Sequence, residues 1–126
     1  MLIFIHCTDR QGAEDLAARN LLEHLEYMVA NKDKLVYGGM LPASPGEGST
    51  GRLFVLELPT MEAAEEFAAS EPYNRAGLFD RVEIRQFRQM WPEPGPGTLE
   101  HLLELERERR RGTQRADAAA GTGGET

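Results

Sequence analysis

The chain has 126 residues, 40% hydrophobic and 28% charged, with a formal net charge of -7. This length fits one domain with a sizeable core, and an acidic chain without a basic patch is atypical of nucleic-acid binders. A single cysteine excludes an intramolecular disulfide; no basic leader or membrane-length apolar run opens the chain, so we expect a cytoplasmic protein.

Apolar runs and their boundaries predict four strands and two helices. The strands fall at residues 2–8, 35–41, 52–58 and 81–90. The helices fall at residues 13–31 and 60–70, and a Pro/Gly/Ser loop is expected at 42–51. We expect the single cysteine, Cys7, to be a buried, inert thiol inside the first strand.

The first helix carries an apolar arc that we expect to face the core. His24 lies at the border of this arc, at roughly 90° from its centre when successive residues are about 100° apart. A border position allows the side chain to line a cavity, and a half-exposed surface histidine is the alternative. The arc is formed by Ala18, Leu21, Leu22, Leu25, Met28 and Val29.

The element order is βαββαβ, which predicts a ferredoxin-like α+β fold with a four-stranded antiparallel sheet. Two helices cover only one face of such a sheet, yet the first and third strands are apolar on both faces. The uncovered face therefore needs a partner. A second copy of the chain is the simplest one, so we expect a homodimer of the dimeric α+β barrel type.

The sequence changes character after Trp91. We divide the chain into a domain at residues 1–91 and a tail at 92–126. The tail begins as a Pro/Gly linker, continues as a short helix at residues 98–111, and is expected to be disordered from Gly112 onward.

Known nucleotide-binding, zinc-binding and serine-hydrolase motifs are absent from the sequence. We therefore expect no cofactor and no metal. Histidines are the natural candidates for acid–base chemistry near neutral pH. Three histidines are present, at positions 6, 24 and 101, and His101 lies in the tail.

Two segments carry a resemblance to a known family. The first is His24-Leu25-Glu26-Tyr27-Met28, and the second is Glu71-Pro72-Tyr73 followed by Ala76-Gly77-Leu78-Phe79. Together they resemble the YciI-like (YCII-related) family of small dimeric α+β barrel proteins. The likeness covers residues 1–90.

The resemblance implies a catalytic dyad made of His24 and Glu71. The family acid is usually aspartate, and an arginine commonly stands where this chain has Leu21. The implied activity is cofactor-independent acid–base chemistry, namely elimination, isomerisation or cyclisation of an oxygenated aromatic, quinone or lactone. The alternatives are a non-catalytic ligand-binding or accessory protein and a haem- or oxygen-handling barrel.

Further residues are expected to line the substrate cavity. Phe4 and His6 share one face of the first strand, and Arg52 is a candidate for holding an anion. Each has a structural alternative, such as a strand-end histidine bonded to backbone or an exposed arginine. The predicted substrate-binding set is His6, Phe4, Tyr37, Arg52 and Tyr73, and the expected partner is a small organic molecule, with neither nucleic acid nor membrane.

Overall fold

The computed structural model describes residues 1–44 and 48–124. Residues 45–47 of the predicted 42–51 loop and residues 125–126 of the tail lie outside the described part. The described chain forms two units, Met1–Arg88 and Gln89–Thr126. Its described helices include none that is long and apolar enough to cross a membrane.

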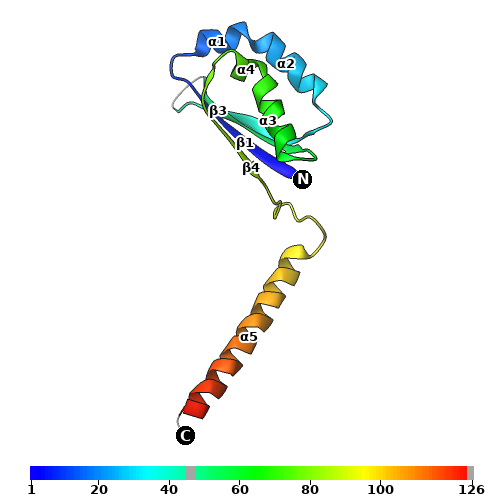
Figure 1. Cartoon of the computed structure of the whole chain (residues 1–126), viewed down its shortest axis with the longest axis vertical. Coiled ribbons are helices and arrows are strands. Elements are labelled where there is room, and N and C mark those ends of the chain that lie inside the picture. Colours follow the sequence, from blue (N-terminus) through cyan, green and yellow to red (C-terminus); the bar gives the residue numbers. More distant parts are fainter. Residues whose placement is uncertain (45–47, 125–126) are drawn as a thin grey trace. The chain divides into compact units, whose positions relative to one another are not determined.

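The first unit is a four-stranded antiparallel sheet with its helices on one face (Figure 1). The strands are β1 (Leu2–Asp9), β2 (Leu35–Pro42), β3 (Ser49–Glu57) and β4 (Phe79–Gln86), in the spatial order β2-β3-β1-β4. The helices are α1 (Glu14–Arg19), α2 (Leu21–Ala30), α3 (Met61–Ser70) and α4 (Pro72–Arg75). The predicted ferredoxin-like arrangement is confirmed.

The core lies between the sheet and the helices. Strand alternation sends every second residue of β1 toward the helices, where Ile3, Ile5 and Cys7 are buried. Their register partners Leu56 and Phe54 on β3 face the same way, and Phe54 meets Phe67 of α3 edge to face. The side chains of the helices pack against this apolar layer.

The first predicted helix is divided into α1 and α2 at Asn20. The Asn20 side chain donates to the carbonyl of Leu16 at 2.8 Å, which competes with regular helical bonding. The expected orientation of this helix is wrong. Its leucine side is exposed, with Leu22 65% and Val29 71% accessible, and His24 points into the interior.

Polar contacts explain why α2 turns this face toward the interior. Tyr27 donates from its hydroxyl to the carbonyl of Phe67 at 2.8 Å, and His24 contacts the buried side chain of Glu71. Both bonds tie α2 to α3 and α4. A helix face with such partners is preferred inside because buried polar groups need hydrogen bonds.

The second unit contains α5 (Thr98–Gly124), one helix of 27 residues. The expectation of disorder from Gly112 onward is contradicted as far as Gly124. Ion pairs one turn apart support the helix, including Glu106 with Arg109 and Arg110. A run of alanines at residues 118–120 adds strong helix formers beyond Gly112.

Candidate functional site

Glu71 is held at the junction between α3 and α4. Pro72 cannot continue α3, but it suits the first position of a new helix, so Glu71 becomes the N-cap of α4. Its Oε2 accepts a hydrogen bond from the backbone N–H of Asn74 at 3.2 Å. The side chain is only 2% exposed. The Glu-Pro sequence thus places a carboxylate inside the protein at a fixed angle.

His24 of α2 meets this carboxylate. Its Nδ1 lies 2.5 Å from Oε1 of Glu71, and the contact is buried. Nδ1 can donate to an ionised carboxylate, which only accepts hydrogen bonds, and in the neutral imidazole of that tautomer Nε2 keeps its lone pair. Within the described residues, no hydrogen-bond partner is recorded for Nε2. The arrangement therefore presents a base that is oriented by an acid.

Tyr73 joins this pair to a second charged pair. Its ring stacks on the His24 ring, with centroids 4.2 Å apart and an interplanar angle of 15°. The Arg52 guanidinium carbon lies 4.5 Å from the centre of the Tyr73 ring. Arg52 Nη2 is 3.8 Å from Oδ2 of Asp9. The structure thus brings together four of the predicted site residues: His24, Glu71, Arg52 and Tyr73.

Sequence reasoning missed Asp9. The predicted first strand ends at residue 8, whereas β1 continues to Asp9, with a register irregularity between Thr8 and Asp9. Cys7 is the register partner of Arg52, and Asp9 lies two positions further along β1, on the same side of the strand. An acid at the end of one strand and an arginine near the start of its antiparallel neighbour are the signal that could have found it.

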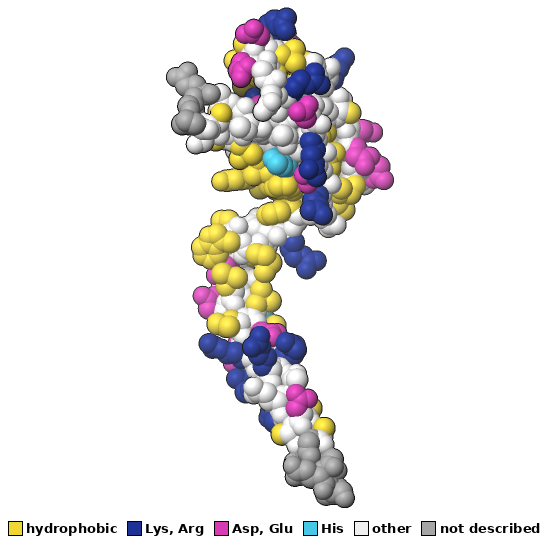
Figure 2. Space-filling model, turned by 90° about the vertical axis from the view of Figure 1, so that its left-hand side faces the viewer, with side chains coloured by type: hydrophobic (Ala, Val, Ile, Leu, Met, Phe, Trp, Pro, Cys, Tyr) yellow, Lys and Arg dark blue, Asp and Glu magenta, His cyan; other side chains and the backbone are white. Residues whose placement is uncertain are grey.

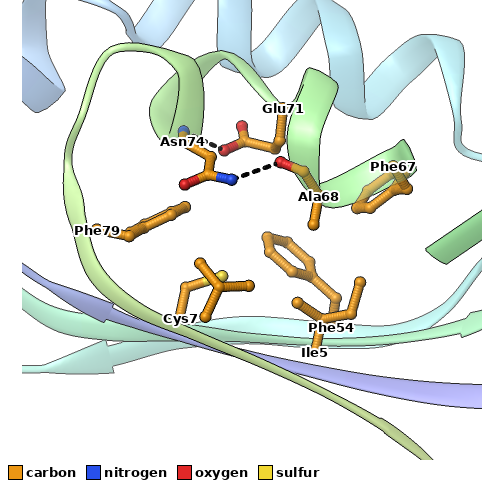
Figure 3. Close-up of a pocket in the computed structure, with 9 residues that line it drawn as sticks. Ile5, Cys7, Phe54, Phe67, Ala68, Glu71, Asn74 and Phe79 are labelled. Carbon is orange, nitrogen blue, oxygen red and sulfur yellow. Dashed lines mark hydrogen bonds between the residues drawn. The ribbon is translucent and has the colours of Figure 1, made fainter. Parts of the chain in front are cut away.

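Glu71 also roofs a small cavity, of about 10 Å³ (Figure 3). Cys7 lies on its floor, and Asn74 donates across it to the carbonyl of Ala68 at 2.8 Å. Burial, and then the charges of Glu71 and Asp9, raise the pKa of Cys7 to about 12, while Arg52 opposes the shift. Cys7 is therefore a protonated core thiol at neutral pH.

Two tyrosines near the dyad also have perturbed acidity. Burial raises the pKa of Tyr27, and the charge of Glu71 adds to the shift. Burial also raises the pKa of Tyr73, where Arg52 acts in the opposite direction and Glu71 and Asp9 add to the rise. Both phenols therefore remain protonated near neutral pH and are able to donate.

Phe4, His6 and Tyr37 do not share this site. In strand register, His6 pairs with Leu53, and Phe4 and Tyr37 both pair with Val55, on the sheet face away from the helices. The expectation that they line one cavity with His24 is wrong within a subunit. Strand alternation is the cause, because the residues that face the dyad are Cys7 and Arg52.

The described part of the chain contains no cluster of side chains that could hold a metal ion. No group of three or more His, Cys, Asp or Glu side chains there converges as a metal site would require. The site as built offers a base, an acid, an arginine and an aromatic ring. Such a set is suited to moving a proton on a small polar molecule.

Comparisons with known proteins identify the family and the fold of this chain. Protein YciI from Escherichia coli O6:H1 and from Shigella flexneri is 26% identical over 98 residues, covering 72% of this chain and 100% of each relative. The 5-chloro-2-hydroxyhydroquinone dehydrochlorinase TftG from Burkholderia phenoliruptrix AC1100, solved with 2,5-dihydroxybenzoquinone, superposes with a TM-score of 0.69 at 24% identity, covering 74% of this chain and 99% of that one. That likeness shows a shared fold. The YCII-related domain model matches residues 1–88, so the predicted resemblance is confirmed: the chain belongs to the YCII-related domain family.

Proposed function

We propose that this chain is a small enzyme in which His24 is the general base and Glu71 orients it. The observation that carries the proposal is the buried 2.5 Å contact between His24 Nδ1 and Glu71 Oε1, with Nε2 left for a substrate. The pair resembles the base and its orienting acid in catalytic triads. No cofactor is required for a proton transfer of this kind.

The chemistry would proceed in two proton movements. Nε2 removes a proton from a substrate O–H or C–H, and the carboxylate of Glu71 stabilises the imidazolium that forms. The imidazolium then returns the proton to a leaving group or to another substrate atom, which gives elimination, isomerisation or cyclisation. A positioned base of this kind contributes roughly 10²–10⁴-fold in rate.

The proposed substrate is an oxygenated aromatic, a quinone or a lactone. Support comes from the dehydrochlorinase TftG, whose structure holds 2,5-dihydroxybenzoquinone and whose fold is similar. Fold likeness alone is weak support for a reaction. The aromatic ring of Tyr73 beside the imidazole adds local support, because it offers an apolar contact next to the base.

We also propose a homodimer that forms through the sheet face opposite the helices. Hydrophobic side chains gather on the lower part of the first unit, Met1–Arg88 (Figure 2). On this face Tyr37 is 71% exposed, and Leu41 and Phe87 are also exposed. A second copy would cover these residues with the same face. A cytoplasmic location and the absence of nucleic-acid and membrane partners remain parts of the proposal.

A non-catalytic ligand-binding role is the second candidate. Two residues favour it: Glu71 and Leu21 stand where the resembled family usually has aspartate and arginine, so the residues that the family uses are changed. The two candidates differ in whether a bound molecule is converted.

A turnover experiment separates them. The purified chain is incubated with 5-chloro-2-hydroxyhydroquinone, with a hydroxylated quinone and with an unsaturated lactone, and chloride release and absorbance are followed. We expect at least one class to react faster than in buffer, and His24→Ala to remove the acceleration. Equal rates with and without protein for all three classes would contradict the enzymatic proposal and favour the binding role.

A further inference from the structure

A second, larger cavity opens beside the strand ends of β1 and β3. Its volume is about 210 Å³, which exceeds the ~150 Å³ that is enough for a benzene-sized molecule. The wall combines the charged side chains of β1 and β3 with small residues of α1 and apolar residues of neighbouring segments. The residues that matter here are Asp9, Arg52, Ala13, Ala17, Met40 and Leu78.

Two residues that line this cavity each carry a buried polar atom with no hydrogen-bond partner in the described part of the chain. These atoms are Oδ1 of Asp9 and Nε of Arg52. The Asp9 side chain is only 8% exposed and that of Arg52 13%. Their nearest mutual contact, 3.8 Å between Nη2 and Oδ2, is too long for a hydrogen bond. Although the two side chains form an ion pair, these two buried atoms lack a hydrogen bond and call for a partner from outside the chain.

The chemistry of these atoms defines that partner. Asp9 Oδ1 is an acceptor and needs an O–H or N–H, whereas Arg52 Nε–H is a donor and needs an oxygen. A simple anion would satisfy Arg52 but would be repelled by Asp9. A molecule that carries a hydroxyl beside a carbonyl satisfies both groups at once.

We propose that this cavity binds the hydroxy-carbonyl end of a small molecule, with its hydroxyl donating to Asp9 and its carbonyl accepting from Arg52. This assignment deepens the proposed function and rests on it for the reaction, while the binding step stands on the cavity. Arg52 also contacts the Tyr73 ring on which His24 stacks. Tyr73 is therefore in contact with both Arg52 and the proposed base.

The charged residues at the rim of the cavity do not set its selectivity. Arg10 and Glu14 also line the cavity, but Arg10 is directed to Asp80, with its Nε 3.6 Å from Oδ1 of that residue. Asp9 and Arg52 are far more buried than this exposed pair. The selectivity for a donor beside an acceptor therefore comes from Asp9 and Arg52.

The test uses maltol, a six-membered ring with a hydroxyl next to a carbonyl, and its O-methyl ether, which lacks the donor. Binding to the full chain is followed by ¹⁵N–¹H correlation spectra during titration. We expect saturable maltol binding with shifts at Asp9 and Arg52, and at least tenfold weaker binding of the ether. Equal affinities, or no binding of maltol, would overturn the proposal.

Variants of Asp9 and Arg52 test the two proposed hydrogen bonds to the ligand. Arg52→Met keeps an unbranched side chain but removes the guanidinium, and it should weaken maltol binding at least tenfold, as should Asp9→Asn. Arg52→Lys keeps the charge but lacks Nε, so it should not restore affinity. Arg75→Met removes an exposed arginine outside both cavities and should bind like the wild type. Wild-type affinity in Arg52→Lys would overturn the bond to Nε.

One further variant separates binding from catalysis. His24→Ala should bind maltol with unchanged affinity, because His24 does not line this cavity. Loss of turnover with retained maltol binding supports both proposals. Retained maltol binding in a chain that converts no substrate would contradict the enzymatic function and leave the binding site standing.

Discussion

Glu71→Gln is a small change with an unusual expected consequence. In the wild type, Oε1 accepts from His24 Nδ1 and Oε2 accepts from the Asn74 backbone N–H. Glutamine has one oxygen and one NH₂ group. If its oxygen stays on Asn74, the NH₂ faces Nδ1 of His24, and both contacts survive only when Nδ1 accepts. The proton must then move to Nε2, and the base is lost.

The magnitudes follow from the same contacts. Glu71→Gln exchanges a charge-assisted bond for a neutral one, which costs about 1 kcal/mol of unfolding free energy. Glu71→Ala removes the N-cap bond to Asn74, worth about 1 kcal/mol, and leaves the buried Nδ1–H of His24 without an acceptor at about 1–3 kcal/mol. We therefore expect Glu71→Ala to cost roughly 2–4 kcal/mol. We therefore expect Glu71→Gln to change the tautomer of His24 while it lowers the free energy of unfolding only slightly.

Two measurements check this without a known substrate. Chemical unfolding gives the free energies, and imidazole ¹⁵N shifts report which nitrogen of His24 is protonated. Glu65→Gln, at an exposed site on α3, the helix that precedes Glu71, is the matched control and should change neither. A glutamine variant as unstable as the alanine variant, or one whose Nε2 stays unprotonated, would refute the reasoning.

Three further predictions concern the rest of the chain. Tyr37→Glu on the open sheet face should dissociate the dimer in sedimentation velocity, whereas Val29→Glu on α2, also 71% exposed, should not; equal effects would contradict the proposed interface. Cys7 has a pKa of about 12 against an ordinary 9.0, so the unfolded thiol loses its proton first, and stability should fall as pH rises from 9 toward 12. The slope reaches about 1.4 kcal/mol per pH unit and should be shallower in Cys7→Ala, as urea titrations at several pH values would show; parallel slopes would argue against a buried thiol. Removing the residues after Gly112 should leave thermal unfolding of Met1–Arg88 unchanged, and a large drop in melting temperature would mean that the terminus stabilises it.

Strand patterns were informative because alternation and boundary residues are local. They predicted four strands and the βαββαβ order, and the Glu-Pro sequence marked the end of α3. These features depend on neighbours within a few residues.

The orientation of α2 depends on residues that are distant in the sequence. Its apolar arc predicts that Leu22 and Val29 face the core, yet the partners of His24 and Tyr27 lie on α3 and α4, about 40 residues or more away. Hydrophobic periodicity carries no information on such distant polar bonds. The same limit explains Asp9, whose neighbour Arg52 is set by the pairing of β1 with β3.

The most direct test of the central claim is the turnover rate of His24→Ala, measured with and without added imidazole. If His24 is the base, the variant should lose about 10²–10⁴-fold in rate while its circular dichroism remains native, and imidazole should restore part of the activity. Full activity in His24→Ala would contradict the account.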